Sequence, residues 1–194
     1  MKTFLLALLL HTAPAPAADE ATTSAEVMRL TDEMRNLARR QAWKGVDRSY
    51  RSLEALGGTL GFEEYMVGAL AARQLGYTSQ AYDRLTNAAR LVPSKEVVDW
   101  LFDIDSHYAR VRLVGDGTGP ATLTTTEVPF DPMQARAIEA ATEEAAALGD
   151  FIGMLPEGSY SFGGQVFVVK PGQAVDVVLP CKKKCKGGAR VDVN

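Results

Sequence analysis

Residues 62–93 read FEEYMVGALAARQLGYTSQAYDRLTNAARLVP and contain two helical patterns joined by a short turn. Apolar side chains recur every three or four residues before Gly76, and the same spacing returns before Pro93. Glycine and proline at such positions end helices. The stretch therefore predicts two consecutive amphipathic helices, whose stripes are Phe62, Tyr65, Met66, Ala69 and Leu70, then Ala81, Leu85, Ala88 and Val92.

A weak internal repeat connects this stretch to the residues before it. Residues 40–46 (RQAWKGV) align with residues 75–81 (LGYTSQA) at an offset of 35 residues. Both segments have the pattern of a junction between two helices, and a fixed period of this length is typical of helical repeat proteins.

Three further helices are expected from capping signals and apolar stripes, which makes about five before residue 110. The last helix carries more apolar surface than one stripe requires, so we expect some of its apolar residues to face the residues that follow: Val97, Trp100, Leu101, Phe102, Ile104 and Tyr108. The three are Thr23 to about Gln41, Val46 to Gly57-Gly58, and the Ser94-capped helix to Tyr108.

The segment from Phe62 to Lys95 resembles a tetratricopeptide repeat (TPR). The resemblance rests on residues at the spacing of that family's large, small and proline positions: Tyr65, Ala69, Gly76, Tyr77, Ala81, Ala88 and Pro93. Gly68 stands where the family usually has leucine. The resemblance implies a short TPR-like α-solenoid over residues 18–109.

In such repeats the first helix of each pair lines a groove, so the resemblance implies a peptide-binding surface. The candidate partner contacts are Glu63, Met66, Leu70, Arg73 and Gln74. A second interpretation, at least as good, places Met66 and Leu70 in the core, because apolar residues at helical spacing are usually packed.

Beyond Tyr108 the apolar period changes from 3.6 to 2, which predicts strands. A glycine-rich turn at residues 115–120 separates two alternating runs and predicts a hairpin of Val111 and Leu113 with Ala121 and Leu123. Turns at 163–164 and 171–172 predict a three-stranded meander over residues 160–179.

One helix is expected between these strand blocks. Asp131-Pro132 is an N-cap followed by proline at the first helical position, and Gly149 follows the last turn. Residues 132–148 are therefore predicted to form an inserted helix with Ile138, Ala141, Ala145 and Leu148 facing inward.

Three segments of the second half, GMLPEGSY (153–160), FVVKPG (167–172) and VDVVL (175–179), resemble PEGA-type and carboxypeptidase-regulatory-like modules. A Pro-x-Gly corner turns the chain sharply into a strand that begins with an aromatic residue, here Tyr160. The resemblance implies a small β-sandwich over residues 110–180, of a kind that is mostly structural or an interaction unit.

The N-terminus predicts export. Residues 1–17 combine a basic start, an apolar run of 7 residues from Phe4 to Leu10, and an Ala15-Pro16-Ala17 cleavage pattern. Spanning a bilayer needs about 20 apolar residues. We therefore expect a signal peptide cleaved near Ala18, no integral membrane span, and a periplasmic or secreted protein of a Gram-negative envelope.

The composition of the chain and its C-terminal tail limit the classes of partner that we expect. With 21 basic and 24 acidic residues among 194, the chain lacks the excess of positive charge typical of nucleic-acid binders, so no nucleic acid is expected. Residues 181–194 begin CKKKCKGG, and the two cysteines, Cys181 and Cys185, are expected to form a disulfide in an oxidising compartment. The lysines could instead meet an anionic cell-wall polymer.

The sequence contains little that indicates an enzyme active site. His107 has no nucleophile motif around it and is expected to cap or pack at a helix end. The sequence offers no metal site and no cofactor motif. Paired acids could act in a hydrolase only if the fold brought distant ones into one cleft, the candidates being Asp99, Asp103, Asp105, Glu143 and Glu144.

The sequence thus predicts an α+β protein, a short α-solenoid followed by a small β-sandwich with one inserted helix. The function it favours is that of a non-enzymatic envelope scaffold or adaptor that binds partner proteins. The alternative is a cell-wall or polysaccharide-binding module that uses the β-sandwich and the lysine tail. An exposed row of aromatic side chains on one sheet would favour this alternative.

Overall fold

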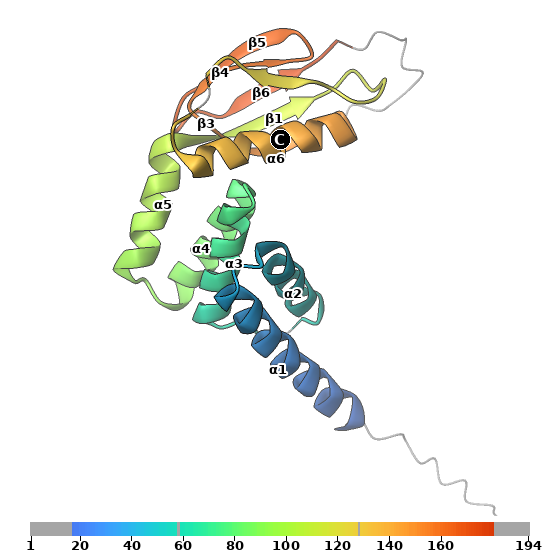
Figure 1. The fold of residues 1–194 in the computed structure, drawn as a ribbon, viewed down its shortest axis with the longest axis vertical. Helices are drawn as coiled ribbons and strands as arrows, with labels where there is room; N and C mark the ends of the chain where they lie inside the picture. Colours follow the sequence, from blue (N-terminus) through green and yellow to red (C-terminus); the bar gives the residue numbers. More distant parts are fainter. Residues whose placement is uncertain (1–16, 58, 128, 181–194) are drawn as a thin grey trace, which may run out of the picture.

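The computed structural model describes residues 17–57, 59–127 and 129–180, and it has an α+β fold (Figure 1). Five helices come first and lead into two small sheets with a sixth helix beside them. The helices are α1 (Ala17–Arg39), α2 (Trp43–Ala55), α3 (Phe62–Gln74), α4 (Thr78–Leu91), α5 (Lys95–His107) and α6 (Pro132–Leu148). The strands are β1 (Tyr108–Val114), β2 (Leu123–Thr125), β3 (Phe151–Pro156), β4 (Gly158–Phe162), β5 (Gln165–Val169) and β6 (Val175–Val178).

The first helix differs from its predicted bounds at both ends. It begins at Ala17 instead of Thr23, because four of the residues 17–21 (AADEA) are alanine or glutamate, which are good helix formers. It ends at Arg39 instead of Gln41, whose backbone adopts a left-handed φ of 55° in the turn to α2. The predicted signal peptide lies outside the described residues except for Ala17.

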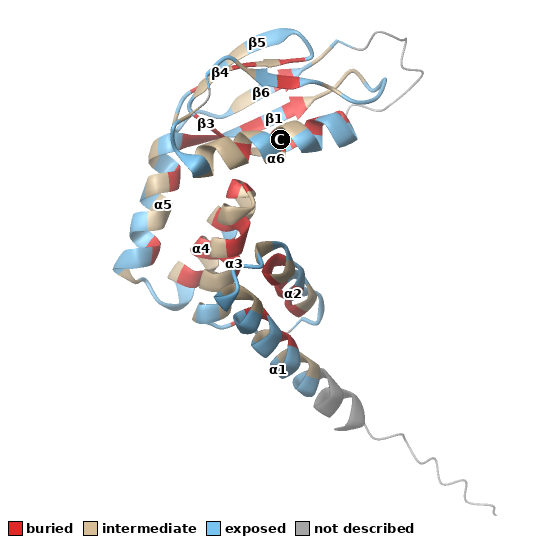
Figure 2. Cartoon of the chain, in the orientation of Figure 1, coloured by how far each residue is buried: buried red, intermediate tan, exposed pale blue. Residues whose placement is uncertain are grey.

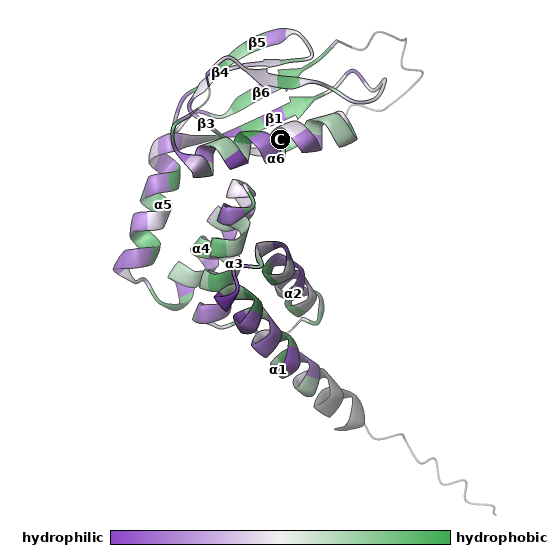
Figure 3. Ribbon diagram, viewed as in Figure 1, coloured by the Kyte–Doolittle hydropathy of each residue, from purple (hydrophilic) through white to green (hydrophobic). Residues whose placement is uncertain are grey.

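The helices α1 to α5 pack successively, each on the next or the one before it. Leu30, Met34, Val46, Tyr50 and Leu53 form the buried centre of the first group, and Ala69, Leu85, Ala88, Val97 and Ile104 that of the second. Val92, which we expected on the buried stripe of α4, is 47% exposed because the helix ends at Leu91. Figure 3 shows hydrophobic and hydrophilic residues on the same helices, as expected where one face is buried.

A buried ion pair crosses this helical region. Arg84 of α4 lies 2.8 Å from Asp47 of α2, and both residues are buried. The Arg84 guanidinium also donates to the Gly68 carbonyl at 2.7 Å and lies 3.9 Å from the centroid of the Tyr50 ring. Because Gly68 has no side chain, the Tyr50 ring packs directly on α3.

The strands form two sheets of three, in the orders β3-β1-β6 and β2-β4-β5. The predicted hairpin of β1 with β2 is wrong, since these strands lie in different sheets. The predicted meander is correct for the β4–β5 hairpin and wrong for β6, which runs parallel to β1. Residues 115–120, interpreted as a hairpin turn, instead carry the chain from one sheet to the other, and Gly115 donates to Asp150 at 2.6 Å.

Strand β3 was not predicted. Its residues FIGMLP do not alternate, so they lack the period of a strand with one buried face, yet they pair antiparallel with β1 from Tyr108↔Pro156 to Leu113↔Phe151. The Pro-x-Gly corner then moves the chain into the other sheet. There the Tyr160 hydroxyl donates to the Pro156 carbonyl at 2.9 Å and fixes the corner.

Helix α6 has the predicted bounds, Pro132–Leu148. The Asp131 side chain accepts from the Met133 amide at 2.8 Å, and Gly149 ends the helix with φ 83°. Ala141 and Ala145 pack into one core shared by residues of both sheets. Figure 2 shows buried residues on α6 and on the strands beside it. Leu148 is 70% exposed, contrary to expectation.

The two parts of the chain meet mainly through α6 and β3, which contact α3 and α4. Ala137 of α6 and Met154 of β3 are buried in the same cluster as Ile104 of α5 and Tyr108. The expectation that α5 faces the β region is therefore met by Ile104 and by Tyr108 at its end, whereas Phe102 is 71% exposed.

Candidate binding groove

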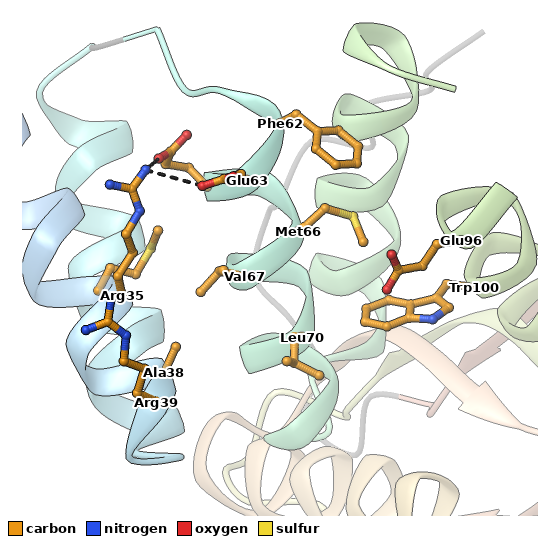
Figure 4. A pocket seen from close by; sticks show the side chains of 12 residues that line it. Arg35, Ala38, Arg39, Phe62, Glu63, Met66, Val67, Leu70, Glu96 and Trp100 are labelled. Atoms are coloured by element: carbon orange, nitrogen blue, oxygen red, sulfur yellow. Dashed lines mark hydrogen bonds and ion pairs between the residues drawn. The ribbon is translucent and has the colours of Figure 1, made fainter. Parts of the chain in front are cut away.

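A cavity of about 420 Å³ lies between α1, α3 and α5 (Figure 4). If the helices are grouped as α1–α2, α3–α4 and α5, these three are the first helix of each group. Helix α3 forms its floor, with α1 on one side and α5 on the other. Its lining residues are Met34, Arg35, Ala38, Arg39, Phe62, Glu63, Glu64, Met66, Val67, Leu70, Glu96 and Trp100.

The floor is apolar because α3 buries its small residues and leaves its large ones in the groove. Gly68, Ala69, Ala71 and Ala72 are the buried residues of α3. Such small residues let the neighbouring helices approach α3 closely. The larger side chains, Phe62, Met66, Val67 and Leu70, are half-buried and line the cavity.

Charged side chains border this floor on both sides. On α1, Arg35 lies 3.4 Å from Glu63 and 3.1 Å from Glu64. Arg39, one turn further along α1, donates a hydrogen bond to the Asn36 side chain at 3.2 Å. Glu96 lines the opposite side beside Trp100 (Figure 4). Because Arg35 is paired with acidic residues, the charges that the groove offers a ligand are Arg39 on the α1 side and Glu96 on the α5 side.

Three of the five predicted partner contacts, Glu63, Met66 and Leu70, line this groove. Met66 and Leu70 are half-buried and line the groove, and Met66 also packs against the buried cluster of the second helical group. Arg73 forms an ion pair with Asp103, and its guanidinium lies 5.6 Å from the centroid of the Trp100 ring, which it helps to position.

The Gln74 side chain interacts with α6 instead of α5. Its side chain accepts a hydrogen bond from Arg136 of α6. Arg73 and Gln74 are therefore not among the residues that line the groove, because their side chains interact with α5 and α6. These neighbours are distant in sequence, and helical spacing within α3 does not reveal them.

Sequence reasoning missed the contributions of α1 and α5. The rule that the first helix of each pair lines the groove, applied to those helices as well, would have indicated one face of each. The missed residues include Arg35, Ala38, Arg39, Glu96 and Trp100.

His107 lies at the end of α5, where its Nδ1 is 2.8 Å from the Asp103 carbonyl oxygen. This position agrees with a role in capping. Within the residues that the structure describes, no three His, Cys, Asp or Glu side chains are grouped so that they could hold a metal ion. Cys181 and Cys185 lie outside the described residues.

The acids considered for a hydrolase do not share a cleft. Asp105 lines a cavity with Tyr82 and Tyr108. Glu143 and Glu144 line another, polar cavity between α6 and the α3–α4 turn, and partial burial raises the pKa of Glu144. Asp99 forms an ion pair with Lys95 at 2.5 Å.

The aromatic residues of the β4–β5 hairpin point into the core. Tyr160 and Phe162 are buried, and Phe167 stacks on Tyr160 with 5.7 Å between ring centroids. These three side chains therefore do not form the exposed aromatic row that would favour a polysaccharide-binding face.

Comparisons of the chain with protein-family models, with curated proteins and with solved structures gave no match. Among the described helices, none combines the length and the apolar character needed to cross a membrane.

Proposed function

We propose that this chain is a non-enzymatic adaptor of the bacterial cell envelope that binds a segment of a partner protein in the groove between α1, α3 and α5. We further infer that α1 to α5 form a TPR-like solenoid and that the two sheets form a PEGA-like β-sandwich. The observation that carries the proposal is the apolar floor on α3, bordered by Arg35 and Arg39 of α1 and by Glu96 of α5.

The groove has the chemistry of a peptide site. Half-buried Met66, Leu70 and Trp100 offer apolar surface whose burial favours binding, since each apolar Å² removed from water contributes about 25 cal/mol. Charged residues at both sides select register and orientation more than they add affinity. A segment with apolar anchors, an acidic residue toward Arg39 and a basic residue toward Glu96 fits this arrangement.

The proposed location rests on the N-terminal sequence. Residues 1–17 have the three parts of a secretory signal, and the disulfide expected between the two cysteines of the tail suits an oxidising compartment. The partner is accordingly proposed to be an envelope protein.

The test is a selection of random displayed peptides on the purified protein, followed by fluorescence anisotropy of the peptides that bind. We expect peptides with apolar anchors. Leu70→Glu, which places a charge on the floor, should weaken their binding at least about tenfold. The matched control is Val178→Glu on β6, where the side chain is 55% exposed and remote from the groove lining.

Two exposed positions keep the test independent of folding. Arg39→Glu and Glu96→Lys change only the charge at the sides of the groove, and each should weaken peptides that carry the complementary residue. Equal affinity of the wild type and of all three groove variants would refute the proposed site.

A further inference from the structure

Among the residues that the structure describes, strand β5 forms one end of its sheet and pairs with β4 alone (Figure 1). A two-residue turn joins them, and Gly163 and Gly164 both have positive φ, 55° and 89°. The residues that flank such a turn, Phe162 and Gln165, form a hydrogen-bonded pair. Because the ladder alternates, the peptide groups of Val166 and Val168 point away from β4, toward the free edge.

This edge lacks the protection that natural edge strands usually have. Its five residues, QVFVV, include neither a charge nor a proline. Val166 is 74% exposed and Val168 53% exposed on the outer face. The end strands of the other sheet differ: β6 carries Asp176, ion-paired with Arg112 at 3.1 Å, and β3 packs against α6.

We propose that β5 pairs antiparallel with β5 of a second copy of this chain, centred on Phe167, so that the two three-stranded sheets become one sheet of six. In this register Val166 lies opposite Val168 of the other copy. The outward peptide groups of these two residues then satisfy one another across the two-fold axis.

The edge is complementary to itself in this register. Phe167 is half-buried on the inner face, and in a pair without hydrogen bonds between the opposed residues the two Phe167 rings come close enough to cover each other. Lys170, which follows the strand, lies opposite Gly164 of the other copy, so like charges are not opposed. A second copy of this chain necessarily has the phenylalanine and the charge pattern that fit this edge, whereas an unrelated strand would need them by coincidence.

The register makes a charge test possible. In a Val166→Lys/Val168→Lys variant, each new lysine lies opposite a lysine of the second copy, and the same holds for glutamates in Val166→Glu/Val168→Glu. Each variant alone should dimerise at least about tenfold more weakly than the wild type. A mixture of the two variants should restore the dimer, because lysine then lies opposite glutamate.

The measurement is sedimentation equilibrium or light scattering over a range of concentrations. A reducing agent is present throughout, so that disulfides between Cys181 or Cys185 of different copies do not contribute. Val178→Lys, on an exposed face of the other sheet, is the control and should dimerise like the wild type. A monomeric wild type at all concentrations, or undiminished dimers of the doubly charged variants, would overturn the proposal.

Discussion

Gly76 lies directly against the backbone carbonyl of Arg136, in the space that any side chain at position 76 would need. The glycine ends α3 with φ 80°, and Arg136 belongs to α6, sixty residues further along the chain. Arg136 also donates to the side chain of Gln74, so the turn between α3 and α4 is attached to α6 at two points. This contact joins the helical region to the region of the sheets.

Gly76→Ala should lower the free energy of unfolding by more than about 2 kcal/mol, because it combines a left-handed φ with a collision against backbone that cannot move aside. Urea denaturation followed by circular dichroism measures the loss. Gly57→Ala is the matched control, since φ is 67° there and the added Cβ meets no atom within 4 Å. It should cost only about 1 kcal/mol. Equal losses would mean that the contact with α6 contributes nothing.

Gly68→Ala should destabilise the protein by about 1 to 3 kcal/mol, although alanine is the better helix former. The added methyl group would enter the ring of the buried residue Tyr50. Gly45→Ala, also within a helix, meets only the flexible end of Leu37 at 3.1 Å and should stay within about 1 kcal/mol of the wild type. Thermal unfolding of the two variants compares them directly, and a stabilised Gly68→Ala would contradict this packing.

Arg84→Met should lower stability by about 3 kcal/mol, because the Asp47 carboxylate stays buried without its main partner. Arg51 also pairs with Asp47, at 2.9 Å, but its side chain is 54% exposed, so Arg51→Met should cost about 1 kcal/mol or less. The double variant Arg84→Met/Asp47→Leu should be more stable than Arg84→Met. Chemical denaturation of the wild type and the three variants measures these free energies of unfolding. Small and equal losses for Arg84→Met and Arg51→Met would contradict a buried role for Arg84.

Two aromatic residues of α5 should respond differently to truncation. Trp100 is half-buried beside Arg73, and Trp100→Ala should cost about 2 kcal/mol. Phe102 is 71% exposed, so Phe102→Ser should change stability by no more than about 0.5 kcal/mol. A large loss for Phe102→Ser in thermal unfolding would mean that α5 packs on a further surface in solution.

How far the sequence predicted this fold depends on how local each signal is. The inserted helix was predicted at its observed bounds because Asp131, Pro132 and Gly149 act within one turn of its ends. The prediction of strand pairing failed because the partners of β1 are distant in sequence. In the sheet, β3 and β6 lie on the two sides of β1, and both come much later in the chain. Nothing within the run from Val111 to Leu123 distinguishes a hairpin from a change of sheet.

The candidate groove was predicted on one helix only. The spacing of Glu63, Met66 and Leu70 identified the face of α3 that lines it. Arg73 and Gln74 follow in sequence, but their side chains interact with Asp103 of α5 and Arg136 of α6 instead of lining the groove. The sides of the groove formed by α1 and α5 depend on how helices distant in sequence pack together. The apolar pattern of a single helix holds no information about that packing.

The central claim is that a partner segment occupies the groove between α1, α3 and α5, and site-specific photo-crosslinking in the envelope of exporting cells tests it most directly. A benzoylphenylalanine replaces Glu63 or Glu96, both exposed at the groove, or Val178 as the control. We predict that the two groove positions give the same crosslinked partner and that position 178 does not. Absence of a product at both groove positions, or the same product from position 178, would contradict the account.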